Sequence, residues 1–186
     1  FKIIENIDRN KFEVFIIVTE SEQLFNKTVK GNFAKDFYTK NKKEFIFLPY
    51  SVSESREIIS FLSLNILVYC EIGMDYKPYL LSFARLAPIQ INTWGHSETC
   101  GIDTIDYFIS SKHYELEYDI SNKYYSEKLI LTDSLCTCYP NFDFLNNNFK
   151  IRKELGLNEE SNIYCCLQAS FKISEFMEDV INKILE

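Results

Sequence analysis

One polar loop of the sequence contains residue types that can bind or transform a small molecule. It runs from Trp94 to Gly101 and contains His96 and the hydroxyl of Thr99. An imidazole with an ordinary pKa near ~6.5 can accept a proton, donate a hydrogen bond to a sugar or phosphate, or simply pack against its neighbours. All three roles are open for His96, and we expect Thr99 and Gly101 to line the same pocket. Because loops carry both turns and sites, a purely structural crossover is the alternative.

Two apolar runs bracket this loop, and the elements before it alternate between strand-like and helix-like patterns. Pro88 introduces the first run, 89–94, since proline is tolerated at the first position of a strand, and the second run covers 105–109. Upstream, strands are predicted at 13–18, 44–48 and 65–70, and helices at 33–38, from a cap at Ser53, and at about 77–86. This β-α-β-α-β order predicts an α/β fold, in which a parallel sheet has helices on both faces.

The same order predicts where the polar turns lie. The carboxyl ends of parallel strands meet at one edge of a sheet, and α/β proteins hold their ligands at that edge. We therefore expect the turn Gly73 to Asp75 and the loop Gly95 to Gly101 to lie on the same edge.

The end of the sequence predicts a second region with a candidate anion site. A further strand is predicted at 127–131, and the loop-like stretch 141–148 predicts a boundary near residue 140. Beyond it we expect a short helix at 151–155 ended by Gly156, a strand at 161–167 and a helix at 173–185. Lys172 would stand at the start of that helix, where free backbone N–H groups and the helix dipole favour a phosphate or diphosphate. An ordinary solvated lysine is the alternative.

Composition narrows the class of protein. The chain has 186 residues and a net charge of −7, which argues against a nucleic-acid or anionic-membrane surface, because both need a basic face. No apolar run approaches the ~18 residues of a membrane span.

The chain contains six cysteines without a Cys-x-x-Cys pair. We therefore expect no zinc site and no disulfide scaffold, but buried, reduced thiols in a cytoplasmic protein. The first residue is not Met, and we expect the chain to be an internal piece of a longer protein.

Several ordered motifs with fixed gaps together point to a known family. They are Arg85-Leu86-Ala87-Pro88-Ile89-Gln90, Trp94-Gly95-His96, Thr99-Cys100-Gly101 and Asp106-Tyr107-Phe108-Ile109. This pattern resembles the catalytic region of the O-linked N-acetylglucosaminyltransferase-like glycosyltransferases, which include bacterial tetratricopeptide-linked and plant SPINDLY-type members. A second patch, Gln168 to Lys172, resembles the segment that opens the second domain of this family.

The resemblance implies a fold and an activity. Family members have two Rossmann-like domains that face each other across a cleft, the GT-B arrangement, often preceded by tetratricopeptide repeats. Residues 1–140 would be the latter part of the first catalytic domain, and 141–186 the linker and the opening strand and helix of the second, nucleotide-sugar-binding domain. The implied reaction transfers GlcNAc, fucose or a hexose from a UDP- or GDP-linked donor to Ser or Thr of a polypeptide. It proceeds with inversion and without a metal or cofactor.

The resemblance also implies donor-binding residues. In the family, the lysine that matches Lys172 contacts the diphosphate of the donor, and Gln168 matches a form of the motif in bacterial-type members. We expect His96, Thr99 and Gly101 to complete the donor site. Because some relatives carry Tyr at the position of His96, a binding or shaping role is favoured over that of general base, and the base is not identified.

The resemblance covers only part of a catalytic region. The upstream His-bearing segment of the family and its downstream nucleotide-binding residues have no counterpart in this sequence. We therefore expect the 186 residues alone to be inactive. The alternative is a non-catalytic binding or scaffold module that retains the same fold.

Overall fold

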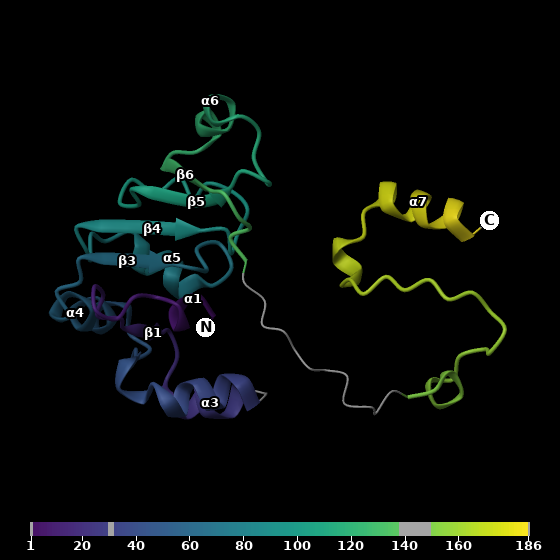
Figure 1. Ribbon diagram of the computed structural model, residues 1–186, viewed down its shortest axis with the longest axis horizontal. Coiled ribbons are helices and arrows are strands. Elements are labelled where there is room, and N and C mark those ends of the chain that lie inside the picture. The colour runs from purple at the N-terminus through teal and green to yellow at the C-terminus, as the bar shows by residue number, and fades with distance from the viewer. Residues whose placement is uncertain (1, 30–31, 138–149, 186) are drawn as a thin grey trace. The chain divides into compact units, whose positions relative to one another are not determined.

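The computed structural model describes residues 2–29, 32–137 and 150–185, which fall into two units. The first unit comprises Phe1–Pro140 and the second Asn141–Glu186. Figure 1 shows the described elements of each unit. The loop expected at 141–148 lies outside the described residues. The assignment of the two units to the halves of a catalytic region stays a prediction.

The first unit is built on parallel strands. Its strands are β1 (Ile16–Val18), β2 (Phe45–Phe47), β3 (Ile66–Tyr69), β4 (Ile89–Thr93), β5 (Tyr107–Ser111) and β6 (Lys128–Thr132). β1 and β2 form one parallel pair, while β3, β4, β5 and β6 form a parallel sheet in chain order (Figure 1). The α/β fold expected from the sequence is confirmed, although the strands divide into two sheets rather than one.

Short helices connect these strands. They are α1 (Lys2–Glu5), α2 (Glu22–Thr28), α3 (Asn32–Lys40), α4 (Val52–Phe61), α5 (Tyr76–Ser82) and α6 (Tyr118–Ser121), with the 3₁₀ helices η1 (Lys42–Glu44) and η2 (Asn122–Tyr124). The cap of α4 is Ser51 rather than the expected Ser53, since the hydroxyl of Ser51 accepts a backbone N–H of the first turn at 3.3 Å. α5 ends at Ser82, before the expected residue 86, and the N–H of Leu86 donates to the side chain of Gln90 at 2.9 Å.

One face of the four-stranded sheet packs into the main core. Buried side chains on this face include Leu67 and Tyr69 of β3. Ile59 of α4, Leu81 of α5 and Ile102 of the crossover after β4 belong to the same apolar cluster. A second, aromatic cluster joins α2, α3 and β2, and consists of Phe25, Phe37, Tyr38 and Phe45. The helices that follow β2 and β3 thus fix where the carboxyl ends of the strands lie.

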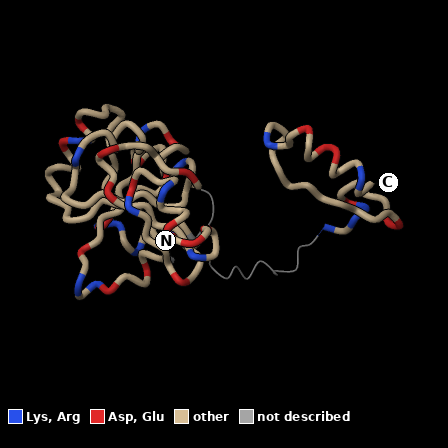
Figure 2. Tube along the Cα trace, turned by 90° about the horizontal axis from the view of Figure 1, so that it is seen from above, with Lys and Arg blue, Asp and Glu red and all other residues tan. Residues whose placement is uncertain are grey.

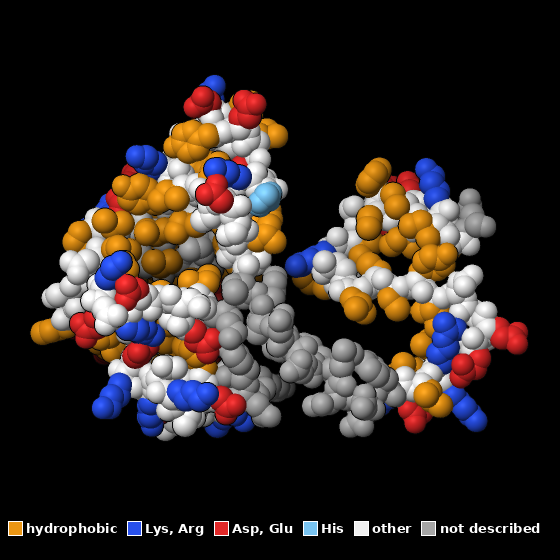
Figure 3. Space-filling view, in the orientation of Figure 1, with side chains coloured by type: hydrophobic (Ala, Val, Ile, Leu, Met, Phe, Trp, Pro, Cys, Tyr) orange, Lys and Arg blue, Asp and Glu red, His pale blue; other side chains and the backbone are white. Residues whose placement is uncertain are grey.

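The opposite face of this sheet is apolar and open within the described residues. It exposes Ile66, Val68, Ile89 and Ile130, and hydrophobic side chains gather over this part of the sheet in Figure 3. The expectation of helices on both faces is therefore met on one face only.

The second unit contains two 3₁₀ helices and one α-helix. They are η3 (Arg152–Leu155), η4 (Ser170–Lys172) and α7 (Glu175–Leu185), and Gly156 ends η3 in the left-handed conformation with φ 69°. The strand expected at 161–167 is wrong, because the described residues 150–185 form no strand that could pair with it. A strand needs a hydrogen-bonded neighbour, which an apolar run cannot supply by itself.

The cysteines do not share one environment. Cys136 is buried, as expected, but Cys70, Cys165 and Cys166 are exposed, so the prediction of buried thiols is wrong for these three. Cys138 lies outside the described residues.

The helices and the charged residues were compared with what a membrane span and a basic surface require. None of the described helices combines the length and the apolar character needed to cross a bilayer. Figure 2 shows acidic and basic residues interspersed along the described parts of the chain.

Candidate functional site

The turn after β3 and the loop after β4 meet at the carboxyl edge of the sheet. A Cβ atom placed on Gly73 would lie 3.2 Å from Cγ of His96, so the imidazole packs against this glycine. A Cβ atom on Gly95 would lie only 1.7 Å from the carbonyl oxygen of Cys70, so the backbones approach too closely for any other residue. Because β3 and β4 are parallel, both contacts lie past the carboxyl ends of their strands. This confirms the expected position of Gly73 and of the start of the 95–101 loop.

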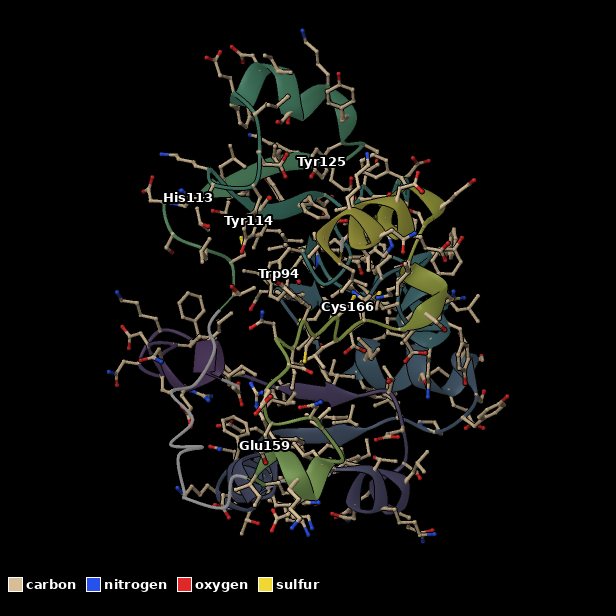
Figure 4. The ribbon with its side chains drawn as sticks, turned by 90° about the vertical axis from the view of Figure 1, so that its right-hand side faces the viewer. Trp94, His113, Tyr114, Tyr125, Glu159 and Cys166 are labelled. Atoms are coloured by element: carbon tan, nitrogen blue, oxygen red, sulfur yellow. The ribbon has the colours of Figure 1, made fainter. Side chains whose placement is uncertain are left out.

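Trp94 fixes the beginning of this loop. Its indole Nε1–H donates to the carbonyl oxygen of Cys136 at 2.9 Å, which ties the end of β4 to the segment after β6. Trp94 thus has a structural role with a specific partner. Figure 4 looks onto this edge and shows Trp94 and His113 on the segments that leave β4 and β5.

His113 is a further candidate at this edge that the sequence reasoning missed. Its Nε2 lies 3.1 Å from the carbonyl oxygen of Asp133, and its backbone N–H donates to Ser111 Oγ at 3.1 Å. Lys112 pairs with Asp133 and lowers the pKa of that carboxyl. The available signal was its position four residues after the strand predicted at 105–109, since His96 likewise follows a predicted strand. Both histidines of the chain therefore stand at one edge of the sheet.

A buried ammonium lies where the two sheets approach α5. Lys77 is 2% exposed, and its Nζ donates to the carbonyl oxygen of Thr19 at 2.8 Å and to that of Pro49. Burial lowers the pKa of Lys77, while neighbouring Asp75 opposes that shift. Asp75 caps α5 by accepting the backbone N–H of Lys77 at 3.4 Å. Lys77 and Asp75 therefore link the ends of β1 and β2 to the start of α5 through hydrogen bonds within the protein.

The second half of the 95–101 loop descends to the amino edge of the sheet. Thr99 Oγ1 donates to Glu127 Oε2 at 2.6 Å, and the N–H of Cys100 donates to Glu127 Oε1 at 2.9 Å. Glu127 is buried and directly precedes β6, at the level where β5 and β6 begin. The structure therefore places Thr99 with Glu127 and not with His96. Gly101 follows at φ +65°, with no atom within 4 Å of a Cβ placed there.

This buried carboxylate is held in its charged form. Burial alone would raise the pKa of Glu127, but hydrogen bonds from Cys100 and Thr99 outweigh burial and hold the pKa below its usual value. Burial raises the pKa of the Cys100 thiol to about 12, and the bond to Glu127 adds to the shift. Cys100 is therefore a protonated donor at neutral pH and not a nucleophile.

A second set of bonds holds the amino edge around Gln90. Its buried amide accepts from the N–H of Leu86 at 2.9 Å and donates to the carbonyl oxygen of Thr104 at 2.8 Å. Asp106 accepts the N–H of Gln90 at 2.7 Å and pairs with Arg85, whose hydrogen bond lowers the pKa of Asp106. Three motif residues, Arg85, Gln90 and Asp106, thus have structural roles.

Gln168 and Lys172 belong to the second unit. The side chain of Gln168 accepts the N–H of Ala169 at 3.0 Å, and Lys172 Nζ lies 6.0 Å from the centre of the Phe171 ring. Both are exposed. α7 begins after Ser174, whose hydroxyl accepts a backbone N–H of the first turn at 3.4 Å. Lys172 therefore precedes the helix and lies in η4, rather than opening α7 as expected.

Comparisons with known proteins place the fold. The sequence matches no protein-family profile and no curated protein. Its structure is similar to that of a lysine-to-methionine mutant of the O-GlcNAc transferase of Thermobaculum terrenum, with a TM-score of 0.60 and 18% identity over 75% of this chain. The chain spans 26% of the length of that structure. It therefore has an α/β fold of the kind found in a GT-B glycosyltransferase.

Proposed function

We propose that the chain is part of a glycosyltransferase that transfers a sugar from a nucleotide-sugar donor to Ser or Thr of a polypeptide, with inversion. The observation that supports it best is the meeting of His96 and Gly73 at the carboxyl edge, in a fold similar to that of an O-GlcNAc transferase. Ligands of α/β proteins bind at such edges. Tetratricopeptide repeats in the same protein and a cytoplasmic location stay predictions.

The proposed reaction sets two chemical requirements. The acceptor oxygen forms a bond to the anomeric carbon while the bond from that carbon to the diphosphate breaks. The hydroxyl proton passes to a base, and the nucleoside diphosphate leaves with additional negative charge. A base and a positive environment therefore have to be present.

His96 is proposed to bind or orient the donor. Its half-buried ring rests on Gly73, so the ring is held in position at the edge and remains partly accessible to solvent. A ring nitrogen can donate to a sugar or phosphate oxygen. Thr99 and Gly101 would act by shaping the loop, because the hydroxyl of Thr99 already bonds with Glu127.

Lys172 is proposed to bind the diphosphate of a UDP- or GDP-linked donor, with Gln168 beside it. Its side chain is exposed, so a full positive charge is available to a ligand. The second candidate function is a non-catalytic binding module. It is favoured by one observation, that the described part of the second unit contains no strand and no buried residue.

The test is transfer of radiolabelled sugar by the full-length protein to a peptide pool, together with calorimetric titration of UDP and GDP. We expect Lys172→Ala to lower turnover about 10²- to 10³-fold, because a contact to the leaving group strengthens in the transition state. Lys183→Ala, an exposed lysine on α7, is the matched control and should leave turnover unchanged. A folded protein that neither transfers sugar nor binds either nucleotide would contradict the proposal in favour of the binding module.

A further inference from the structure

A surface groove of 580 Å³ lies between the start of α2, the end of β2 and the outer side of α4. Its apolar lining consists of Phe47, Leu48, Pro49, Ile58 and Phe61. Three carboxylates, Glu22, Glu54 and Glu57, line it together with Ser21. The groove therefore combines an apolar floor with an acidic rim.

The lining of the groove includes one aromatic ring that is exposed to solvent. Phe61, the last residue of α4, is 89% exposed. Covering such a side chain removes apolar surface from water, which is favourable. A partner that covers this ring gains that stabilisation, and exposed aromatic rings are common anchors in protein interfaces.

The rim offers two carboxylates to a partner. Glu54 and Glu57 are exposed, lie three residues apart on α4, and form no ion pair among the described residues. Glu22 differs, because it already accepts from Tyr38 and pairs with Lys42 at 3.4 Å. The free negative charge is thus concentrated on one side of the groove.

We propose that this groove binds a short basic polypeptide segment, with an apolar side chain seated on the floor beside Phe61 and a flanking Lys or Arg paired with Glu54 and Glu57. Charge complementarity selects this occupant. A second copy of the chain carries the same net charge of −7 and the same two carboxylates, so the acidic rims would repel each other. An acidic segment would be repelled in the same way. This inference does not depend on glycosyl transfer.

The experiment measures fluorescence anisotropy of a rhodamine-labelled peptide of alternating Lys and Leu with a central Phe, titrated with the whole chain. A peptide with Glu in place of every Lys is the second probe. The double variant Glu54→Lys/Glu57→Lys should weaken binding of the basic peptide about tenfold or more, which corresponds to the loss of about 1.4 kcal/mol. Phe61→Ser should weaken it by a similar factor.

The matched control is Glu98→Lys/Asp103→Lys, which reverses two exposed carboxylates outside the groove. It should bind the basic peptide as the unaltered chain does, and circular dichroism verifies that all variants are folded. Absence of binding, equal binding of the acidic peptide, or equal weakening in the control variant would each overturn the proposal. Self-association of the chain that Glu54→Lys/Glu57→Lys abolishes would overturn it as well, because the occupant would then be a second copy.

Discussion

The two edges of the four-stranded sheet are built in different ways. At the amino edge, Gln90 and Glu127 each hold several backbone and side-chain groups through buried hydrogen bonds. At the carboxyl edge, the turns touch at Gly73 and Gly95, while His96 and His113 keep contact with solvent. The 85–109 stretch contributes residues to both edges. Gln90 of this stretch holds the fold, whereas His96 is the residue that we propose to bind the donor.

The largest expected effect is that of Gly95→Ala, which tests whether the two turns meet as described. The new Cβ would lie 1.7 Å from the carbonyl oxygen of Cys70, and neither backbone can move without displacing a strand end. We expect a loss of about 3 kcal/mol in the free energy of unfolding, measured by urea denaturation.

Gly101→Ala is the comparison for this variant. That position has φ +65° and open space around it, so only backbone strain of about 1–2 kcal/mol is expected. Equal losses in the two variants would refute the close contact between the turns.

The next effect concerns the amino edge. Gln90→Leu keeps the volume but leaves the N–H of Leu86 and the carbonyl oxygen of Thr104 without their side-chain partner. Unsatisfied buried polar groups cost about 1–3 kcal/mol, so a loss of about 2 kcal/mol is expected in urea denaturation. Gln23→Leu on the exposed side of α2 should change stability by about 0.5 kcal/mol at most. A Gln90→Leu variant as stable as this control would show that the amino edge does not depend on these bonds.

A smaller effect is the pH dependence supplied by Glu127. Its pKa in the folded chain lies below the usual 4.5, so its bonds add stability above that value. This stability is lost as the pH falls through the folded pKa, because the unfolded chain then takes up the proton more readily. Glu127→Gln should therefore lower stability by about 1 kcal/mol at pH 7 and less at pH 3. Glu117→Gln, at an exposed position, serves as the control. An unchanged acid dependence in Glu127→Gln would contradict this account.

The elements of the first unit could be predicted to a large extent from the sequence. Apolar runs located all six of its strands, because the apolar residues of each strand form a local signal in the sequence. The prediction of a strand at 161–167 was wrong, because an apolar run alone does not make a strand. No strand among residues 150–185 is available to pair with it. α2 was missed because its polar, Lys-containing sequence shows no clear apolar stripe.

The candidate site was predictable only in part. Topology alone brought His96 and Gly73 to one edge, and the same rule applied to β5 would have included His113. The position of Thr99 was not predictable, because it depends on Glu127, which lies 28 residues further along the chain. Burial of a carboxylate by such distant partners leaves no local pattern in the sequence.

We propose that the carboxyl edge of the sheet binds the donor, whereas the amino edge stabilises the fold. The most direct measurement compares sugar transfer per folded molecule and the free energy of unfolding for His96→Ala and Glu127→Gln in the full-length protein. We predict that His96→Ala lowers transfer about tenfold or more while stability changes by about 0.5 kcal/mol at most. Glu127→Gln should lower stability and leave transfer per folded molecule unchanged. The opposite result, full transfer by His96→Ala and lost transfer by folded Glu127→Gln, would contradict the account.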